Sequence, residues 1–246
     1  MGPERPPLEG RLPVAAPRLE TVLLDFDGTL VDTTELIYES MRHATGEVLG
    51  RELPRETLMA NVGQPLPRQM EILADNRPEK AQELLESYRL HNEEHHEDLI
   101  QKFPGVEASL ARLRDAGLGL AVVTSKRRFS VEMALESFTG LRNAVDAFVT
   151  MEDTAEHKPH PAPLLKGLEL LGNVPPEKAA YVGDAPFDVE AARAAGTLSV
   201  AVTWGAFTEE ALRDAEPDHL FKDLDSAVEL LLERAVSDQQ KQKADR

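Results

Sequence analysis

The chain of 246 residues contains no cysteine, and this absence excludes three kinds of chemistry. Without a thiol there can be no disulfide, no thiolate nucleophile and no cysteine-ligated zinc. The sequence also lacks any apolar run that approaches the about 18 residues of a membrane span. Residues 1–17 are rich in proline and arginine and contain no apolar stretch of the kind found in secretory signals. We therefore expect a cytoplasmic protein with no membrane partner.

Positive charge is scarce in this chain. Lys and Arg number 27 against 44 Asp and Glu, and the formal net charge is −17. This balance argues against a nucleic-acid partner, because phosphate backbones are bound by clustered cations. A small anionic substrate would also meet a repulsive long-range field. Any site for such a substrate must therefore supply its own local cations and a metal ion.

Short β-type runs alternate with helical patterns over most of the chain. This alternation is typical of a doubly wound parallel α/β sheet. The predicted strands are residues 21–26, 119–124, 147–150, 179–182, 198–202 and 219–221. The helices predicted between them are residues 106–116, 130–138, 163–171, 188–195, 208–215 and 226–234.

The alternation stops between residues 33 and 101, where the pattern is helical only. Four helices separated by prolines are expected there, at residues 35–49, 56–60, 66–73 and 79–97. A helical insert directly after the first strand lies at the carboxyl end of the sheet, where it can act as a lid. We therefore predict a Rossmann-like core of residues 19–32 and 102–234 with an inserted all-helical cap domain of residues 33–101. Residues 1–18 are expected to be a disordered leader and residues 235–246 a polar tail.

The first apolar strand is followed by Asp25 and Asp27, and then at once by Gly28 and Thr29. Side chains at positions i and i+2 of a strand point to the same side, so both carboxylates leave the sheet together. Two carboxylates this close repel each other unless a cation holds them, and Mg²⁺ is a suitable hard ion. The pair suits a reaction in which one Asp attacks a phosphoryl group while the other handles the proton.

Three further motifs occur later in the chain. A second apolar strand ends at Thr124, Ser125 and Lys126, and a third ends before Asp184 and Asp188. Strand ends of this kind lie where open α/β sheets bind ligands. The remaining motif is the sequence of residues 157–159, which contains Lys158 and precedes a helix. Taken singly, each motif also has a purely structural interpretation, as a helix N-cap or as a solvated lysine.

Taken together over residues 20–235, the four motifs resemble the haloacid dehalogenase superfamily of phosphohydrolases with a helical cap. This resemblance implies an aspartyl-phosphate mechanism with Mg²⁺ as the cofactor. It implies that Asp25 is the nucleophile and that Asp27 is the acid/base. By the same resemblance, Thr124 hydrogen-bonds the transferring phosphoryl group and Lys158 neutralises the charge of phosphate and nucleophile.

The resemblance also implies a ligand set for the metal. Asp184 would bind it together with the Asp25 carboxylate and the Asp27 backbone carbonyl, and Asp188 would be a supporting acid nearby. The remaining residues of these motifs, expected on the substrate side, are Gly28, Thr29, Ser125 and Lys126.

Substrate specificity should come from the cap, because the core recognises only the phosphoryl group. The loop of residues 61–68 joins two predicted cap helices and contains Gln64 and Arg68. Gln64 could donate to a substrate oxygen, and Arg68 could supply a local cation. The alternative is an ordinary turn between helices that carries a surface arginine.

The cap also contains His91, His95 and His96. On a helix His91 and His95 share a face, at a spacing that metal pairs use. No third ligand follows at metalloprotease spacing, so a solvated helix face near the hinge is the favoured interpretation. Residues 88–96, the segment that contains these histidines, resemble the end of the cap in pyrophosphatases and phosphoglycolate phosphatases of the superfamily.

The sequence thus predicts a phosphohydrolase for small phosphorylated metabolites, as a monomer or homodimer. Inorganic pyrophosphate stands ahead of 2-phosphoglycolate, because the cap loop and cap end look most similar to the pyrophosphatases. Two other function classes stay open. One is a phosphomutase or phosphotransferase, in which an acceptor other than water takes the phosphoryl group. The other is a non-catalytic binding protein on the same scaffold, which loss of a motif acid would favour; every motif acid is present.

Overall fold

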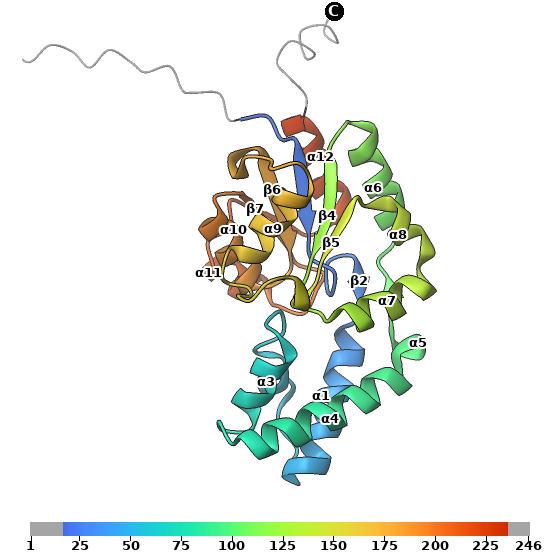
Figure 1. Cartoon of the computed structure of the whole chain (residues 1–246), viewed down its shortest axis with the longest axis vertical. Coiled ribbons are helices and arrows are strands. Elements are labelled where there is room, and N and C mark those ends of the chain that lie inside the picture. The colour runs from blue at the N-terminus through green and yellow to red at the C-terminus, as the bar shows by residue number, and fades with distance from the viewer. Residues whose placement is uncertain (1–16, 236–246) are drawn as a thin grey trace, which may run out of the picture.

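The computed structural model describes residues 17–235 and has a six-stranded sheet at its centre (Figure 1). All neighbouring strands pair in parallel, and their order is β5-β4-β1-β6-β7-β8. The strands are β1 (Thr21–Leu24), β4 (Gly119–Val123), β5 (Ala147–Val149), β6 (Ala179–Gly183), β7 (Leu198–Val202) and β8 (His219–Phe221). The predicted leader and tail lie outside the described residues except for Pro17, Arg18 and Ala235.

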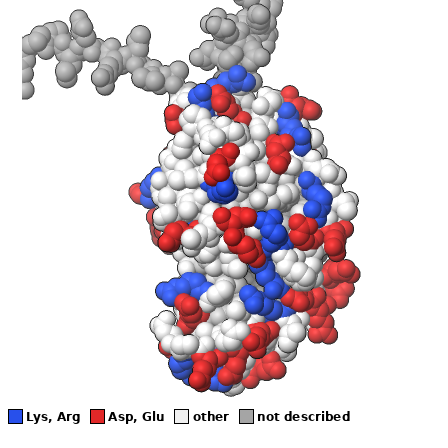
Figure 2. All heavy atoms as spheres, in the orientation of Figure 1, with Lys and Arg blue, Asp and Glu red and all other residues white. Residues whose placement is uncertain are grey.

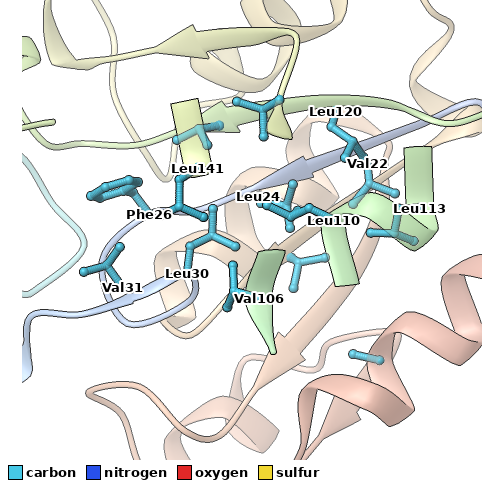
Figure 3. Packing of buried hydrophobic residues seen from close by; sticks show 14 of the residues in the cluster. Val22, Leu24, Phe26, Leu30, Val31, Val106, Leu110, Leu113, Leu120 and Leu141 are labelled. Atoms are coloured by element: carbon cyan, nitrogen blue, oxygen red, sulfur yellow. The ribbon is translucent and has the colours of Figure 1, made fainter. Parts of the chain in front are cut away.

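Helices cover both faces of this sheet, because alternate residues of its central strand point to opposite faces. Val22 and Leu24 pack with α6, α7, α8 and α12, and Figure 3 shows part of this cluster. Leu23 packs on the other face with α9 and α10. The predicted fold class, a doubly wound parallel sheet with an inserted helical cap, is therefore confirmed.

The helices of the core are α6 (Val106–Asp115), α7 (Arg128–Ser137), α8 (Thr139–Ala144), η1 (Met151–Asp153), α9 (Ala162–Leu170), η2 (Pro176–Lys178), α10 (Pro186–Ala195), α11 (Glu209–Asp214) and α12 (Leu224–Ala235).

Strand β1 is two residues shorter than predicted, because the chain turns directly after Asp25. The Phe26 carbonyl accepts hydrogen bonds from the Leu30 and Val31 amides, each at 3.0 Å, which closes a tight loop. The loop leads into β2 (Val31–Asp32), which pairs antiparallel with β3 (Gln101–Lys102). This two-stranded ribbon was not predicted. It carries the chain into and out of the helical insert.

Between β2 and β3 the chain forms only helices, and Figure 1 shows them as a separate lobe beyond one end of the sheet. They are α1 (Thr34–Leu49), α2 (Arg55–Met59), α3 (Leu66–Leu73), α4 (Pro78–Glu94) and α5 (His96–Leu99). Met41, Met70 and Leu84 are among the side chains that form a hydrophobic core belonging to the cap. The single helix predicted for residues 79–97 is interrupted at His95, where the backbone has φ −105° and ψ 6°. None of the helices in the described residues is both long and apolar enough to cross a membrane.

The cap core gives a prediction about stability. Leu84 on α4 is 0% exposed, so its replacement by alanine removes packed methyl groups and leaves a cavity. We expect Leu84→Ala to lower the free energy of unfolding by about 2–5 kcal/mol in urea titrations followed by circular dichroism. Leu90→Ala on the same helix is the matched control, because Leu90 is 71% exposed and should change stability by less than about 0.5 kcal/mol. Equal losses in the two variants would contradict the observed orientation of α4.

Candidate active site

The polar side chains expected to act together converge at the carboxyl ends of three adjacent strands. Asp25 follows β1, Thr124 follows β4 and Asp184 follows β6, and β1 lies between the other two strands. Strand β4 lies on one side of β1 and β6 on the other, so the direction in which strands are added to the sheet reverses at β1. Open α/β sheets bind ligands at such a switch point. The Asp25 amide still donates to the Val182 carbonyl at 2.8 Å, which ties the residue to the edge of the sheet.

Lys158 is buried at the centre of the acidic cluster. Its Nζ lies 2.8 Å from Asp25 Oδ2 and 2.7 Å from Asp188 Oδ1, and it donates to the Tyr181 hydroxyl at 3.0 Å. Burial alone would lower the pKa of Lys158, but the carboxylates of Asp188 and Asp25 raise this pKa above its usual range. The ammonium therefore stays charged and fixes the Asp25 carboxylate.

Three carboxyl groups share this buried space. Ligand oxygens of Asp25, Asp184 and Asp188 all lie within 4.8 Å of one another. Burial raises the pKa of Asp25 to about 7, with Lys158 opposing this rise and Asp188 adding to it. Burial, followed by the charges of Asp188 and Asp25, also raises the pKa of Asp184 well above its ordinary value. A divalent cation would allow all three groups to ionise, and carboxylate oxygens are the donors that Mg²⁺ takes.

A backbone amide and a hydroxyl contact the Asp184 carboxylate. Its Oδ2 accepts a hydrogen bond from the Ala206 amide at 2.8 Å, and Thr29 Oγ1 lies 3.5 Å from its Oδ1. A side chain at Gly28 or Gly205 would overlap this carboxylate. Gly28 also has φ +74°, a conformation that favours glycine. The glycine after Asp27 therefore permits both the turn and the approach of Asp184.

Asp27 forms an ion pair with Lys126 at the edge of the cluster. Lys126 Nζ lies 2.9 and 3.1 Å from the two carboxylate oxygens of Asp27. The Lys126 amide donates to Thr124 Oγ1 at 3.2 Å, which organises the loop after β4. Ser125 Oγ is buried and, among the described residues, has no hydrogen-bond partner. Thr124, Ser125 and Lys126 line the same cavity as Asp25.

A cavity between the core and the cap joins these residues. Its core side includes Asp25, Asp27, Thr124, Ser125, Lys126 and Asp184, and its cap side includes Gly63, Gln64, Gln69, Tyr88, Arg89 and Asn92. Lys158 and Asp188 are buried beneath this surface. Gly28 and Thr29 contact Asp184 from the loop after β1.

The two cap residues predicted to bind substrate have different positions. Gln64 lines the cavity, and its Nε2 donates to Asn61 Oδ1 at 3.2 Å. Arg68 is not among the cavity-lining residues; its side chain is 55% exposed and forms an ion pair with Glu71 at 2.9 Å. The structure therefore brings Gln64 to the core motifs and leaves Arg68 at the surface.

Several residues of the site were missed in the sequence. The Tyr181 hydroxyl accepts from Lys158 and donates to the Val123 carbonyl at 2.9 Å. In the sequence this residue looks like any core aromatic of a strand. Arg89 and Arg127 line the cavity from the cap and from the core. The only signal for Arg89 was its place in residues 88–96, whose resemblance to the cap end of related enzymes gave it no role.

The cap histidines stack on one another. The His91 ring lies between those of His43 and His95, with ring centroids 4.6 and 4.2 Å away. Within residues 17–235, one group of His, Asp or Glu side chains is compact enough to share a metal ion. It is the cluster of Asp25, Asp184 and Asp188, and it does not include the histidines. The stacked rings belong to the packing of α1 against α4.

Residues 22–202 match the family of haloacid dehalogenase-like hydrolases. The chain belongs to this family. Its hydrolase relatives include the "Putative pyrophosphatase PpaX" of Caldanaerobacter subterraneus subsp. tengcongensis, 39% identical over 84% of this chain and 92% of that protein. Pyrophosphatase PpaX of Bacillus cereus is 34% identical over 87% of this chain and 97% of its own length. Among solved structures, a predicted phosphatase from Clostridium acetobutylicum superposes with a TM-score of 0.77 at 27% identity, over 87% of this chain and 99% of that one. The superfamily inferred from the four motifs is thus confirmed.

The buried lysine of this hydrolase gives a second prediction. Lys158→Met keeps the length of the side chain but leaves Asp25 and Asp188 buried without their cation. We expect the free energy of unfolding at neutral pH to fall by about 3–5 kcal/mol, because a broken buried pair leaves uncompensated charge. Urea titration measures this loss. The control is Lys166→Met, which removes an exposed pair with Glu169 on α9 and should cost less than about 1 kcal/mol. A stable Lys158→Met protein would contradict the proposed charge balance.

Proposed function

We propose that this protein is a cytoplasmic, Mg²⁺-dependent phosphohydrolase that cleaves inorganic pyrophosphate through an aspartyl-phosphate intermediate. The observation that supports this most strongly is the Asp25 carboxylate, which Lys158 fixes at the end of β1 beside the cavity. Its other oxygen accepts from the Phe26 amide at 2.7 Å, so the nucleophile has a defined orientation before substrate arrives.

In the first step an oxygen of Asp25 bonds to phosphorus, and the bond from phosphorus to the bridging oxygen breaks. The electron pair leaves with the departing phosphate, whose oxygen takes a proton from Asp27. Asp27 enters this step protonated and leaves it as the carboxylate that pairs with Lys126. In the second step Asp27 removes a proton from water as the water oxygen bonds to phosphorus. The bond to Asp25 then breaks, which releases phosphate and restores the carboxylate.

The transferring phosphoryl group carries several negative charges, and the site supplies groups that stabilise them. Lys158 neutralises charge beside the nucleophile, and the Thr124 hydroxyl donates to a phosphoryl oxygen. When bound by Asp25, Asp184 and the Asp27 carbonyl, Mg²⁺ would reduce the repulsion between the carboxylate and the incoming phosphate. Asp188 supports this cluster through its contact with Lys158.

We propose pyrophosphate as the substrate because the two PpaX relatives are named as pyrophosphatases. Their similarity to this chain extends over nearly their whole length. The second candidate is 2-phosphoglycolate. It is favoured by the amides and the guanidinium on the cap side of the cavity, which can bind a carboxylate as well as a phosphate.

Phosphate release with Mg²⁺ tests this proposal. Pyrophosphate and 2-phosphoglycolate are compared at matched low concentrations, so that the initial rates give kcat/KM directly. We expect pyrophosphate to be preferred by about 10-fold or more, since about 1.4 kcal/mol of differential transition-state binding suffices for this. Asp25→Asn should lower kcat by about 10³-fold or more while the circular dichroism spectrum stays unchanged.

Each part of the proposal has its own contradicting result. If the enzyme prefers 2-phosphoglycolate, the proposed substrate is wrong and the proposed reaction at Asp25 stands. Wild-type turnover by Asp25→Asn would refute the nucleophile. Transfer of the phosphoryl group to an added sugar or alcohol, with little free phosphate, would make the protein a phosphotransferase.

A further inference from the structure

Arg89 on α4 lines the cavity from the cap side. Its Nε is buried, yet among the described residues it has no hydrogen-bond partner. The acidic residue one turn further along the same helix, Glu93, forms its ion pair with Arg127 of the core. Arg89 is therefore a cation at a cavity wall, and the Glu93 carboxylate on its own helix is already paired with Arg127.

A second guanidinium lies close to the first. Arg127 also lines the cavity, and its Nε donates to Ser130 Oγ at 3.0 Å. Burial and the charge of Arg127 lower the pKa of Arg89, but an arginine remains protonated at neutral pH. Glu93 pairs with Arg127, and the carboxylates of Glu152 and Glu86 act on Arg89 without pairing with it. Among the described residues, Arg89 thus forms no ion pair of its own.

Neighbouring amide and hydroxyl groups extend the same wall. Asn92 lies one helical turn after Arg89, is buried, and donates to the Tyr88 hydroxyl at 3.3 Å. Gln69 donates through Nε2 to the Gln64 carbonyl at 2.7 Å, while its Oε1 is buried without a partner within residues 17–235. Buried polar groups without partners are rare in folded proteins. Of these two, Arg89 Nε is a donor and can bind an anion, whereas Gln69 Oε1 is an acceptor.

The cavity is thus polarised. Asp25, Asp27 and Asp184 line its core side, where a metal and a phosphoryl group would bind, and Arg89 lines its cap side. Figure 2 shows basic side chains, with acidic ones beside them, at the level where the cap meets the core on the face in view. A substrate with anionic groups at both ends matches this distribution of charge.

We propose that Arg89, with Asn92 beside it, binds the second anionic group of the substrate and so selects substrates that carry two anionic ends. The inference rests on the proposed function, because it takes Asp25 as the position of the reacting phosphoryl group. It gives Arg89 the role that the sequence suggested for Arg68, which is exposed and paired with Glu71. For pyrophosphate the second anion is the departing phosphate, and for 2-phosphoglycolate it is the carboxylate.

Two substrates separate this role from a structural one. Pyrophosphate has a second anionic group and ethyl phosphate has none. We expect Arg89→Gln to lower kcat/KM for pyrophosphate by on the order of 100-fold, because it removes a charged hydrogen bond to the substrate. The same variant should hydrolyse ethyl phosphate within about twofold of the wild-type rate, since that substrate makes no such bond.

Two further variants sharpen the comparison. Arg89→Lys keeps the charge but loses the planar fork, so its kcat/KM for pyrophosphate should lie between those of the wild type and Arg89→Gln. Arg51→Gln removes an exposed cap arginine that lies 3.6 Å from Asp75, and it should leave both substrates unchanged. An equal loss for both substrates in Arg89→Gln, or no loss for either, would overturn the proposal.

A binding measurement keeps this inference separate from the proposed function. Calorimetric titration of pyrophosphate into the Asp25→Asn protein needs no turnover. Arg89→Gln in that background should weaken binding by on the order of 100-fold, and unchanged affinity would overturn the role of Arg89. If wild-type protein fails to hydrolyse pyrophosphate while this Arg89-dependent binding persists, the proposed reaction fails and the anion site stands.

Discussion

The ion pairs of Lys158 are the interaction on which the rest of the site depends. Burying Asp25 and Asp188 beside each other is unfavourable, and the Lys158 ammonium between them offsets much of that cost. The surrounding backbone is adapted to this arrangement. A side chain at Gly183 would overlap the Asp188 carboxylate, so a glycine at the end of β6 lets the first turn of α10 approach the lysine. Tyr181 on the same strand then accepts the third hydrogen bond of the ammonium.

The core and the cap supply different chemical groups to the cavity. The core supplies carboxylates, a lysine and hydroxyls from rigid strand ends, which suits the common phosphoryl group. The cap supplies amides and a guanidinium from helices with a hydrophobic core of their own. The pair between Glu93 of the cap and Arg127 of the core spans the junction of the two lobes. In the proposed function, a change of substrate would therefore come from the cap while the reaction proposed at Asp25 is kept.

The sequence predicted those parts of the molecule that follow from local pattern. Asp25, Thr124 and Asp184 each follow an apolar strand, and parallel strands bring such ends to one edge of a sheet. The ribbon of β2 and β3 escaped prediction because strands of two residues have no periodicity. The sequence indicated Arg68 as the cation of the cap and gave Arg89 no role. Arg68 pairs with Glu71 on its own helix, while Arg89 reaches the cavity because α4 packs against α1 and α3, which no local pattern encodes.

Thermal unfolding as a function of Mg²⁺ concentration tests the central claim, that the buried carboxylates need a cation in addition to Lys158. Because an ion that binds only the folded state stabilises it, Tm of the wild-type protein should rise with Mg²⁺ and then saturate. Asp184→Asn removes one ligand of the cluster, so its Tm should lose most of this Mg²⁺ dependence. A wild-type Tm that does not respond to millimolar Mg²⁺, or an equal response in Asp184→Asn, would contradict the account.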